Sequence, residues 1–141
     1  MNPGKLLIVG AALIGAQHAW SVHQRSRLEH QTLAGANANG FIDVLMPDGA
    51  PPHTVLVFAP LNCPSDGAKR ADAMAERLTA LGIPNIRTSQ YQASGLRPGQ
   101  KELMEHTNVV MSGTIPVVII DGMGKSNPSM DEIASEYRRN L

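Results

Sequence analysis

The single cysteine of this chain, Cys63, lies between a short apolar run and a helical pattern. The apolar run covers residues 54–59, and Pro64 follows the cysteine directly. A strand that ends here would place the thiol at the start of a helix, near backbone N–H groups without intrahelical partners and at the positive end of the helix dipole. Both effects favour the thiolate, which is the nucleophilic form of cysteine. This arrangement indicates thiol chemistry, and a buried structural thiol is the alternative.

Asp66 lies three residues after Cys63, and we expect its negative charge to raise the pKa of the Cys63 thiol. A chain with one cysteine has no second thiol with which to release its own mixed disulfide. An acid in the first turn of a helix is also common without any catalytic role. Exchange at Cys63 would therefore need a second thiol from outside the chain.

The elements that position Cys63 follow from the hydrophobic periodicity. The run over 54–59 is continuous, which suits a strand buried on both faces of a sheet. A helix is predicted over 68–81, because its apolar residues recur at helical spacing and Gly82 follows as a stop. Residues 84–91 read as a second strand. The crossover through the helix predicts that the two strands are parallel.

The rest of the chain adds a second layer of elements. Residues 41–46 have strand composition, either as an edge strand or as a lead-in, and a second helix is predicted over 100–111. A buried strand over 117–120 follows Thr114-Ile115-Pro116, and residues 124–127 suit a hairpin partner for it. The last helix is announced by a capping-box pattern, in which Ser129 is the N-cap and Glu132 the third helical residue.

This order of elements, with Cys-Pro at a helix start and Thr-Ile-Pro before a later strand, resembles the thioredoxin-like fold in its compact glutaredoxin form. The resemblance implies an α/β three-layer sandwich with a mixed sheet of about four strands, flanked by three helices and preceded by an N-terminal apolar helix. It implies that Cys63 is the nucleophile and that Pro64 opens the helix. It also implies that the backbone of Thr114, Ile115 and Pro116 docks the substrate beside a cis bond at the proline.

We therefore expect a monothiol thiol-disulfide exchange protein, whose partner is a protein thiol or disulfide or a glutathione adduct. A thioredoxin-fold binding module that has lost catalysis, and that holds a partner on the face of the cis proline, is the alternative. Residues 122–127 do not carry the Gly-Gly-x-Asp pattern with which glutaredoxins hold glutathione, so we expect no bound cofactor, although glutathione is the one candidate. Asp66 distinguishes the two hypotheses, because it disfavours exchange and is harmless to binding.

Composition narrows the remaining classes of function. The formal net charge is zero, which gives no electrostatic footprint for nucleic acid. The histidines show no ligand-like spacing with one another or with the cysteine, so no metal site is expected. His53 and His106 read as surface residues. Lys125 reads as a solvated turn lysine, with contact to an anionic ligand as the alternative.

The N-terminal region reads as a targeting segment. Lys5 precedes an apolar run over 6–16, which extends to residue 22 if Gln17 and His18 are tolerated. We expect a signal anchor or signal peptide over 1–22 that contacts a membrane through 6–22, with a buried helix as the alternative. A polar linker over 23–40 and a thioredoxin-like domain over 41–141 complete the predicted organisation. The expected location is the periplasmic face of a bacterial inner membrane, with the cytoplasm as the alternative.

Overall fold

The computed structural model describes the backbone of residues 3–141 and the side chains of residues 15–27 and 29–141. The chain divides into two compact units, and the boundary between them falls between Ala34 and Gly35. The first unit is one helix, and the second is an α/β domain that contains Cys63.

Helix α1, Pro3–Ala34, forms the first unit, and its described residues before Arg27 are exposed. Among the helices that the structure describes, none is long and apolar enough to cross a membrane. The prediction of a membrane-spanning signal anchor over 1–22 is therefore wrong. The unbroken apolar run of helix α1, residues 6–16, is shorter than the roughly 20 residues that a spanning helix needs. The side chains of residues 6–14 in that run lie outside the described residues.

In the structure the predicted polar linker over 23–40 falls into two parts. Helix α1 continues through its first part, because Gln24, Arg25, Arg27 and Glu29 are good helix formers and no glycine or proline interrupts them. The second part forms hydrogen-bonded turns of the α/β domain.

The domain is built on a mixed sheet of five strands in the order β1-β5-β4-β2-β3. The strands are β1 (Ile42–Asp43), β2 (Val55–Phe58), β3 (Asn85–Thr88), β4 (Val117–Ile120) and β5 (Met123–Ser126). Strands β2 and β3 are parallel, as the predicted crossover required, and the other pairs are antiparallel. The expected α/β class with a mixed sheet is confirmed, and the hairpin partner of β4 is present as β5.

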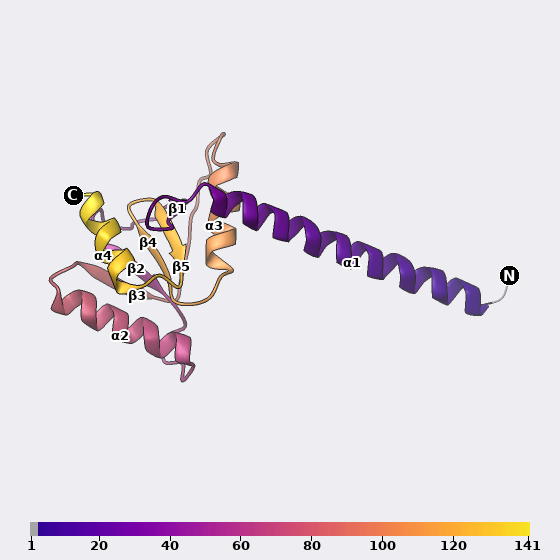
Figure 1. Ribbon diagram of the computed structural model, residues 1–141, viewed down its shortest axis with the longest axis horizontal. Helices are drawn as coiled ribbons and strands as arrows, with labels where there is room; N and C mark the ends of the chain where they lie inside the picture. The colour runs from indigo at the N-terminus through magenta and orange to yellow at the C-terminus, as the bar shows by residue number, and fades with distance from the viewer. Residues whose placement is uncertain (1–2) are drawn as a thin grey trace. The chain divides into compact units, whose positions relative to one another are not determined.

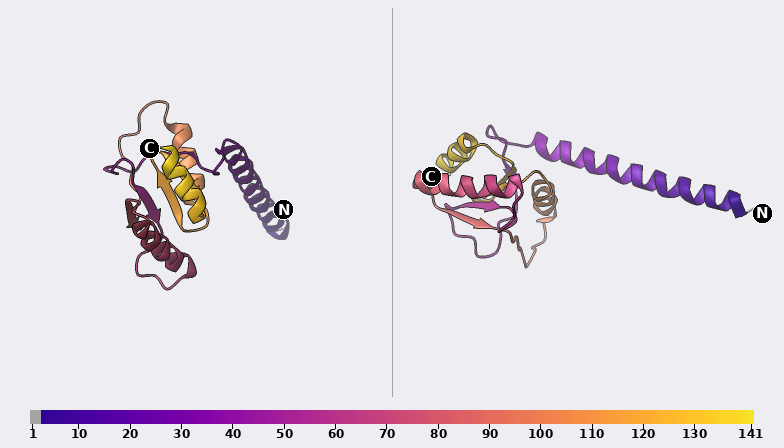
Figure 2. Two further views of the ribbon diagram at one scale, coloured as in Figure 1. Left: turned by 60° about the vertical axis from the view of Figure 1, so that its left-hand side comes forward. Right: turned by 90° about the horizontal axis from the view of Figure 1, so that it is seen from below.

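Three helices cover the two faces of this sheet (Figures 1 and 2). They are α2 (Asp66–Ala80), α3 (Lys101–Met111) and α4 (Met130–Arg139). Buried side chains of α2 and α4 pack against Val55, Val57, Val118 and Ile120, which share one face of the central strands. Val110 of α3 packs against the opposite face, whose buried side chains are Leu56, Phe58, Val117 and Ile119. Strands β2 and β4 are buried on both faces, which explains their continuous apolar sequences.

Candidate functional site

The loop that carries Cys63 and the loop that carries Pro116 leave the sheet at the same edge. Phe58, the last residue of β2, pairs with Val117, the first residue of β4. Because these strands are antiparallel, the residues after Phe58 and the residues before Val117 emerge side by side. The sheet register thus brings together the two segments that the sequence singled out.

Helix α2 begins at Asp66, two residues before the start that the periodicity predicted and two residues after Pro64, which the resemblance implied would open it. Its N-cap is Ser65, whose hydroxyl accepts a hydrogen bond from the N–H of Ala68 over 3.3 Å. Cys63 therefore lies two residues before the cap, and Pro64 precedes the cap instead of opening the helix. The chain reaches this position through Asn62, which has a left-handed φ of 51°, a conformation that asparagine adopts more readily than most residues. Since Ser65 caps the helix, the cysteine sulfur does not take that role.

The sulfur of Cys63 is instead stabilised by Ser65. Cys63 Sγ lies 3.4 Å from Ser65 Oγ and donates to it in the thiol form. After deprotonation the hydroxyl proton of Ser65 can turn toward the sulfur, because the bond from Ala68 uses only a lone pair of that oxygen. Hydrogen bonding from the Ser65 side chain, and then from its backbone, lowers the pKa of Cys63, while desolvation of the sulfur raises it to a lesser degree.

Asp66 does not have the expected effect on the thiol. It is the first residue of α2, is exposed, and is not among the causes of the shift of the Cys63 pKa, which is downward overall. The expected rise of this pKa is therefore not seen. An exposed carboxylate is screened by water, and the short-range hydrogen bonds to the sulfur outweigh it. Asp66 occupies the first turn of the helix, where the dipole favours an acid.

The peptide bond between Ile115 and Pro116 is cis, as expected. Pro116 is buried, Ile115 is half-buried and Thr114 is exposed. A Cβ atom added at Gly67, in the first turn of α2, would lie 2.5 Å from Cγ1 of Ile115 and 3.4 Å from its carbonyl oxygen. Close packing of the 114–116 segment on α2 thus requires a glycine at position 67.

Arg70, one turn further along α2, reaches the same segment. Its Nη2 donates a hydrogen bond to the carbonyl oxygen of Ile115 over 2.7 Å. Sequence reasoning missed both Gly67 and Arg70. A glycine inside a helical pattern is a signal of close backbone approach and could have drawn attention to Gly67. Arg70 gave no such signal, because an arginine on a polar helix face is ordinary.

Arg87 is a third residue that sequence reasoning missed. It lies on β3 with a side chain only 14% exposed, and Nε donates to Asp72 Oδ1 of α2 over 2.9 Å. Nη2 donates to the carbonyl oxygen of Pro60 over 2.8 Å. Nη1 donates to the carbonyl oxygens of Ala59 and Thr88. The guanidinium therefore ties the start of the Cys63 loop to both β3 and α2, using the planar arrangement of donors that is particular to arginine.

The other predicted candidates lie elsewhere. The turn that opens the 122–127 segment is at the end of β4 opposite Pro116, because β4 ends at Ile120. Lys125 is not a solvated turn lysine, since its Nζ lies 2.8 Å from Glu132 Oε1 and donates to the carbonyl oxygen of Asn39 over 3.0 Å. Neither role predicted for Lys125 is supported, because both of its contacts are within the fold.

The two histidines of the domain that were singled out differ in exposure. The side chain of His53 is 57% exposed, and its Nδ1 lies 3.2 Å from Asp121 Oδ2. The side chain of His106 is only 21% exposed, and its Nδ1 lies 2.9 Å from the carbonyl oxygen of Asp43. Within the described residues no group of three His, Cys, Asp or Glu side chains is placed to hold a metal ion.

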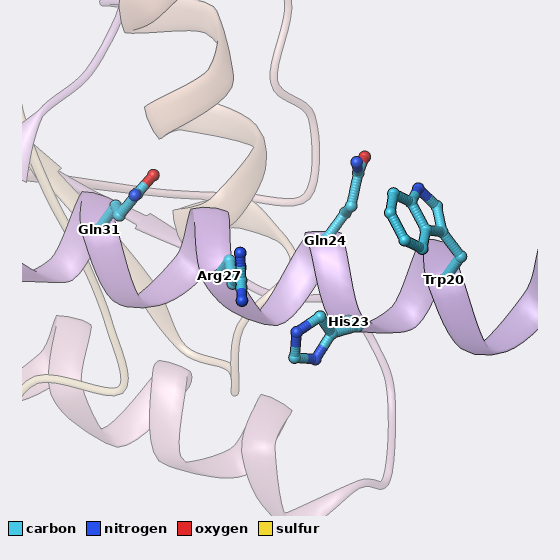
Figure 3. Close-up of a pocket in the computed structure, with 5 residues that line it drawn as sticks. All are labelled: Trp20, His23, Gln24, Arg27 and Gln31. Carbon is cyan, nitrogen blue, oxygen red and sulfur yellow. The ribbon is translucent and has the colours of Figure 1, made fainter.

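Apart from the region of Cys63, helix α1 carries a hollow on its surface that is lined only by its own side chains. It is lined by Trp20, His23, Gln24, Arg27 and Gln31, whose side chains project from successive turns of the helix (Figure 3). Trp20 is 69% exposed. No buried polar group lies among these side chains, so the hollow offers an open helix face and no chemistry comparable to that at Cys63.

The candidate site is therefore the sheet edge formed by Cys63, Ser65 and the 114–116 segment, supported by α2 and Arg87. Comparison with known proteins adds no further identification: no family model, no curated protein and no solved structure matches this chain.

Proposed function

We propose that this chain is a thioredoxin-like protein of the glutaredoxin type, which exchanges disulfides through the single thiol of Cys63. The observation that carries the proposal is the sulfur of Cys63, whose pKa is lowered by Ser65 at the sheet edge shared with the cis Ile115–Pro116 bond. The order of strands and helices from β2 to α4, with parallel β2 and β3 and antiparallel β4 and β5, agrees with that assignment.

The proposed reaction uses the thiolate as the nucleophile. Cys63 Sγ attacks one sulfur of a substrate disulfide, the substrate S–S bond breaks, and a mixed disulfide forms between Cys63 and one half of the substrate. The other half leaves as a thiolate and takes a proton from water. The substrate disulfide is the oxidant, and the thiol of Cys63 is oxidised.

Release of the mixed disulfide requires another molecule. The chain has no second cysteine, and position 66, where a resolving thiol would stand, is an aspartate. An external thiol, either glutathione or a protein thiol, therefore attacks the mixed disulfide and regenerates Cys63.

A binding module without catalysis is the second candidate, and Asp66 is the observation that favours it. Such a module would hold its partner on the 114–116 segment. Pro116 is buried and the Ile115 carbonyl already has a donor, so only Thr114 offers a fully exposed side chain there. The exposed area of this segment is therefore small for a docking surface. For this reason we prefer disulfide exchange to the binding module as the proposed function.

The test is the rate at which Cys63 releases thiopyridone from a neutral dipyridyl disulfide at neutral pH. Because Cys63 is the only cysteine, all release reports on this thiol. We expect one equivalent per chain, released faster by the folded protein than by the same chain in denaturant. Once the excess reagent has been removed, added glutathione should release the second thiopyridone from the mixed disulfide on Cys63. A folded protein that reacts no faster than the unfolded chain contradicts exchange and leaves the binding module.

A further inference from the structure

Arg70 of α2 donates a hydrogen bond to the 114–116 segment beside Cys63, at the carbonyl oxygen of Ile115. We propose that Arg70 is a specificity-determining residue, which holds the Ile115 carbonyl and so makes Cys63 react with small disulfides in preference to disulfides carried on an extended peptide. This inference rests on the proposed exchange function and names the class of substrate that the site accepts.

An extended peptide docks on a protein segment by exchanging backbone hydrogen bonds with it, as an added strand does. On the 114–116 segment, Pro116 has no N–H to offer and is buried. The carbonyl of Pro116 accepts the N–H of Asn127 over 2.7 Å, which leaves the carbonyl oxygens of Thr114 and Ile115 as acceptors for such docking. The oxygen of Ile115 already accepts the 2.7 Å bond from Arg70 Nη2.

The position of the Arg70 guanidinium is set by the packing of α2. Gly67 has no side chain between the helix and Ile115, and a Cβ atom there would lie only 3.4 Å from the Ile115 carbonyl oxygen. The absence of a side chain at position 67 lets the helix approach closely, and Arg70 on the next turn then reaches the carbonyl. An incoming peptide must displace the guanidinium, or share the oxygen with it through the second lone pair and gain a weaker bond.

The energetic effect is modest and favours small substrates. A hydrogen bond from a charged donor is weaker where the donor is exposed to water, as Arg70 is, than in a shielded place. About 1 kcal/mol corresponds to roughly fivefold in rate for a substrate that needs the acceptor. A small disulfide without a peptide backbone does not use the acceptor, so its rate is unaffected. Attack by Cys63, release of the leaving thiolate and its protonation by water are otherwise the same for both substrates.

Two reagents with one leaving group isolate this effect. One is ethyl 2-pyridyl disulfide, and the other is a short uncharged peptide whose cysteine carries the same pyridylthio group. Both release thiopyridone when Cys63 attacks the sulfur that belongs to the ethyl group or to the peptide cysteine. One measurement of thiopyridone therefore follows both reactions. The quantity of interest is the rate for the peptide reagent divided by the rate for the ethyl reagent.

We expect Arg70→Ala to raise this ratio about fivefold. Lys69→Ala is the matched control, because Lys69 is an exposed neighbour of equal charge on the same helix and no hydrogen bond joins it to Ile115. The control should leave the ratio at the wild-type value, which excludes a general effect of charge.

The outcomes separate the two proposals. If folded wild-type protein reacts rapidly with the ethyl reagent but Arg70→Ala leaves the ratio unchanged, exchange stands and the role of Arg70 is overturned. An equal rise in Arg70→Ala and Lys69→Ala also overturns it. If folded wild-type protein reacts with neither reagent faster than the unfolded chain, the exchange function itself fails, and the inference about Arg70 fails with it.

Discussion

Replacing Glu136 by alanine is expected to lower the free energy of unfolding of the α/β domain by about 3 kcal/mol. Glu136 is fully buried on α4, and its carboxylate is satisfied by three donors. Asn37 Nδ2 and Asn39 Nδ2 donate to Oε2 over 3.0 and 2.8 Å, and Arg139 Nη2 donates to Oε1 over 3.1 Å. Removing the carboxylate leaves the two amide groups without their acceptor and opens a cavity at the helix.

The same contact explains why the segment before β1 is ordered. Asn37 Oδ1 accepts the N–H groups of Asn39 and Phe41 over 2.9 and 3.0 Å, which holds the turn that delivers Phe41 to the core. Loss of Glu136 should therefore loosen this turn as well. Hydrogen exchange at the amide of Phe41 should accelerate in Glu136→Ala more than exchange in β4.

Denaturant unfolding measures the stability change, with Glu136→Gln and Glu105→Ala beside Glu136→Ala. Glu136→Gln keeps the volume and one acceptor oxygen, so we expect about half the loss. Glu105 is a half-exposed helical glutamate whose carboxylate lies 3.9 Å from Lys101, and its removal should change stability by less than about 0.5 kcal/mol. A loss below about 1 kcal/mol in Glu136→Ala would show that the buried carboxylate does not hold the turn.

Replacing Ser65 by glycine is expected to return the pKa of Cys63 toward its ordinary value. The Ser65 hydroxyl is the largest cause of the lowered pKa, and glycine removes it. Glycine is chosen because it costs only a few tenths of a kcal/mol as an N-cap in place of serine, whereas alanine costs about 1 kcal/mol. The change in the pKa of Cys63 can then be separated from a change in the stability of helix α2.

The measurement is the alkylation rate of Cys63 against pH, which reports the thiolate fraction. In Ser65→Gly the midpoint should move to higher pH than in the wild type. Ser129→Gly is the matched control, because Ser129 caps α4 in the same way, with its hydroxyl 3.2 Å from the N–H of Glu132. The control should keep the wild-type midpoint. An unchanged midpoint in Ser65→Gly would show that the Ser65 hydroxyl does not lower the pKa of Cys63.

The same shift has a consequence for stability. A thiol whose pKa is lower in the folded chain than in the unfolded chain stabilises the fold at pH values above the unfolded-state pKa. This contribution is lost as the pH falls through the folded-state pKa. The wild type should therefore gain stability over Ser65→Gly as the pH rises toward and past the ordinary value of 9.0. Below the folded pKa only the small difference in capping remains.

Much of the fold could be predicted from the sequence, because its strongest signals are local. The apolar runs predicted β2 and β4, and helical spacing predicted α2 and α3 to within two residues at each end. The capping box of α4 is present, with Ser129 and Glu132 bonded reciprocally. Strand β1 is shorter than the pattern over 41–46 suggested, since only Ile42 and Asp43 pair with β5.

The supporting residues of the site could not be predicted in this way. Arg87, Arg70 and Glu136 are polar residues in patterns that are normally solvated, and the bonds of Glu136 to Asn37 and Asn39 join residues almost one hundred positions apart. No local period encodes such contacts. The two strands β2 and β4 were predicted, and their register in the structure is what places Cys63 beside the 114–116 segment.

The pKa of Cys63 in the folded wild-type protein tests the central claim most directly. It is obtained from the pH dependence of alkylation by a neutral reagent, measured on the folded protein and on the same chain in denaturant. The account predicts a midpoint at lower pH in the folded protein, because the hydrogen bonds of Ser65 stabilise the thiolate. A midpoint equal to or above that of the unfolded chain would contradict an exchange thiol at Cys63.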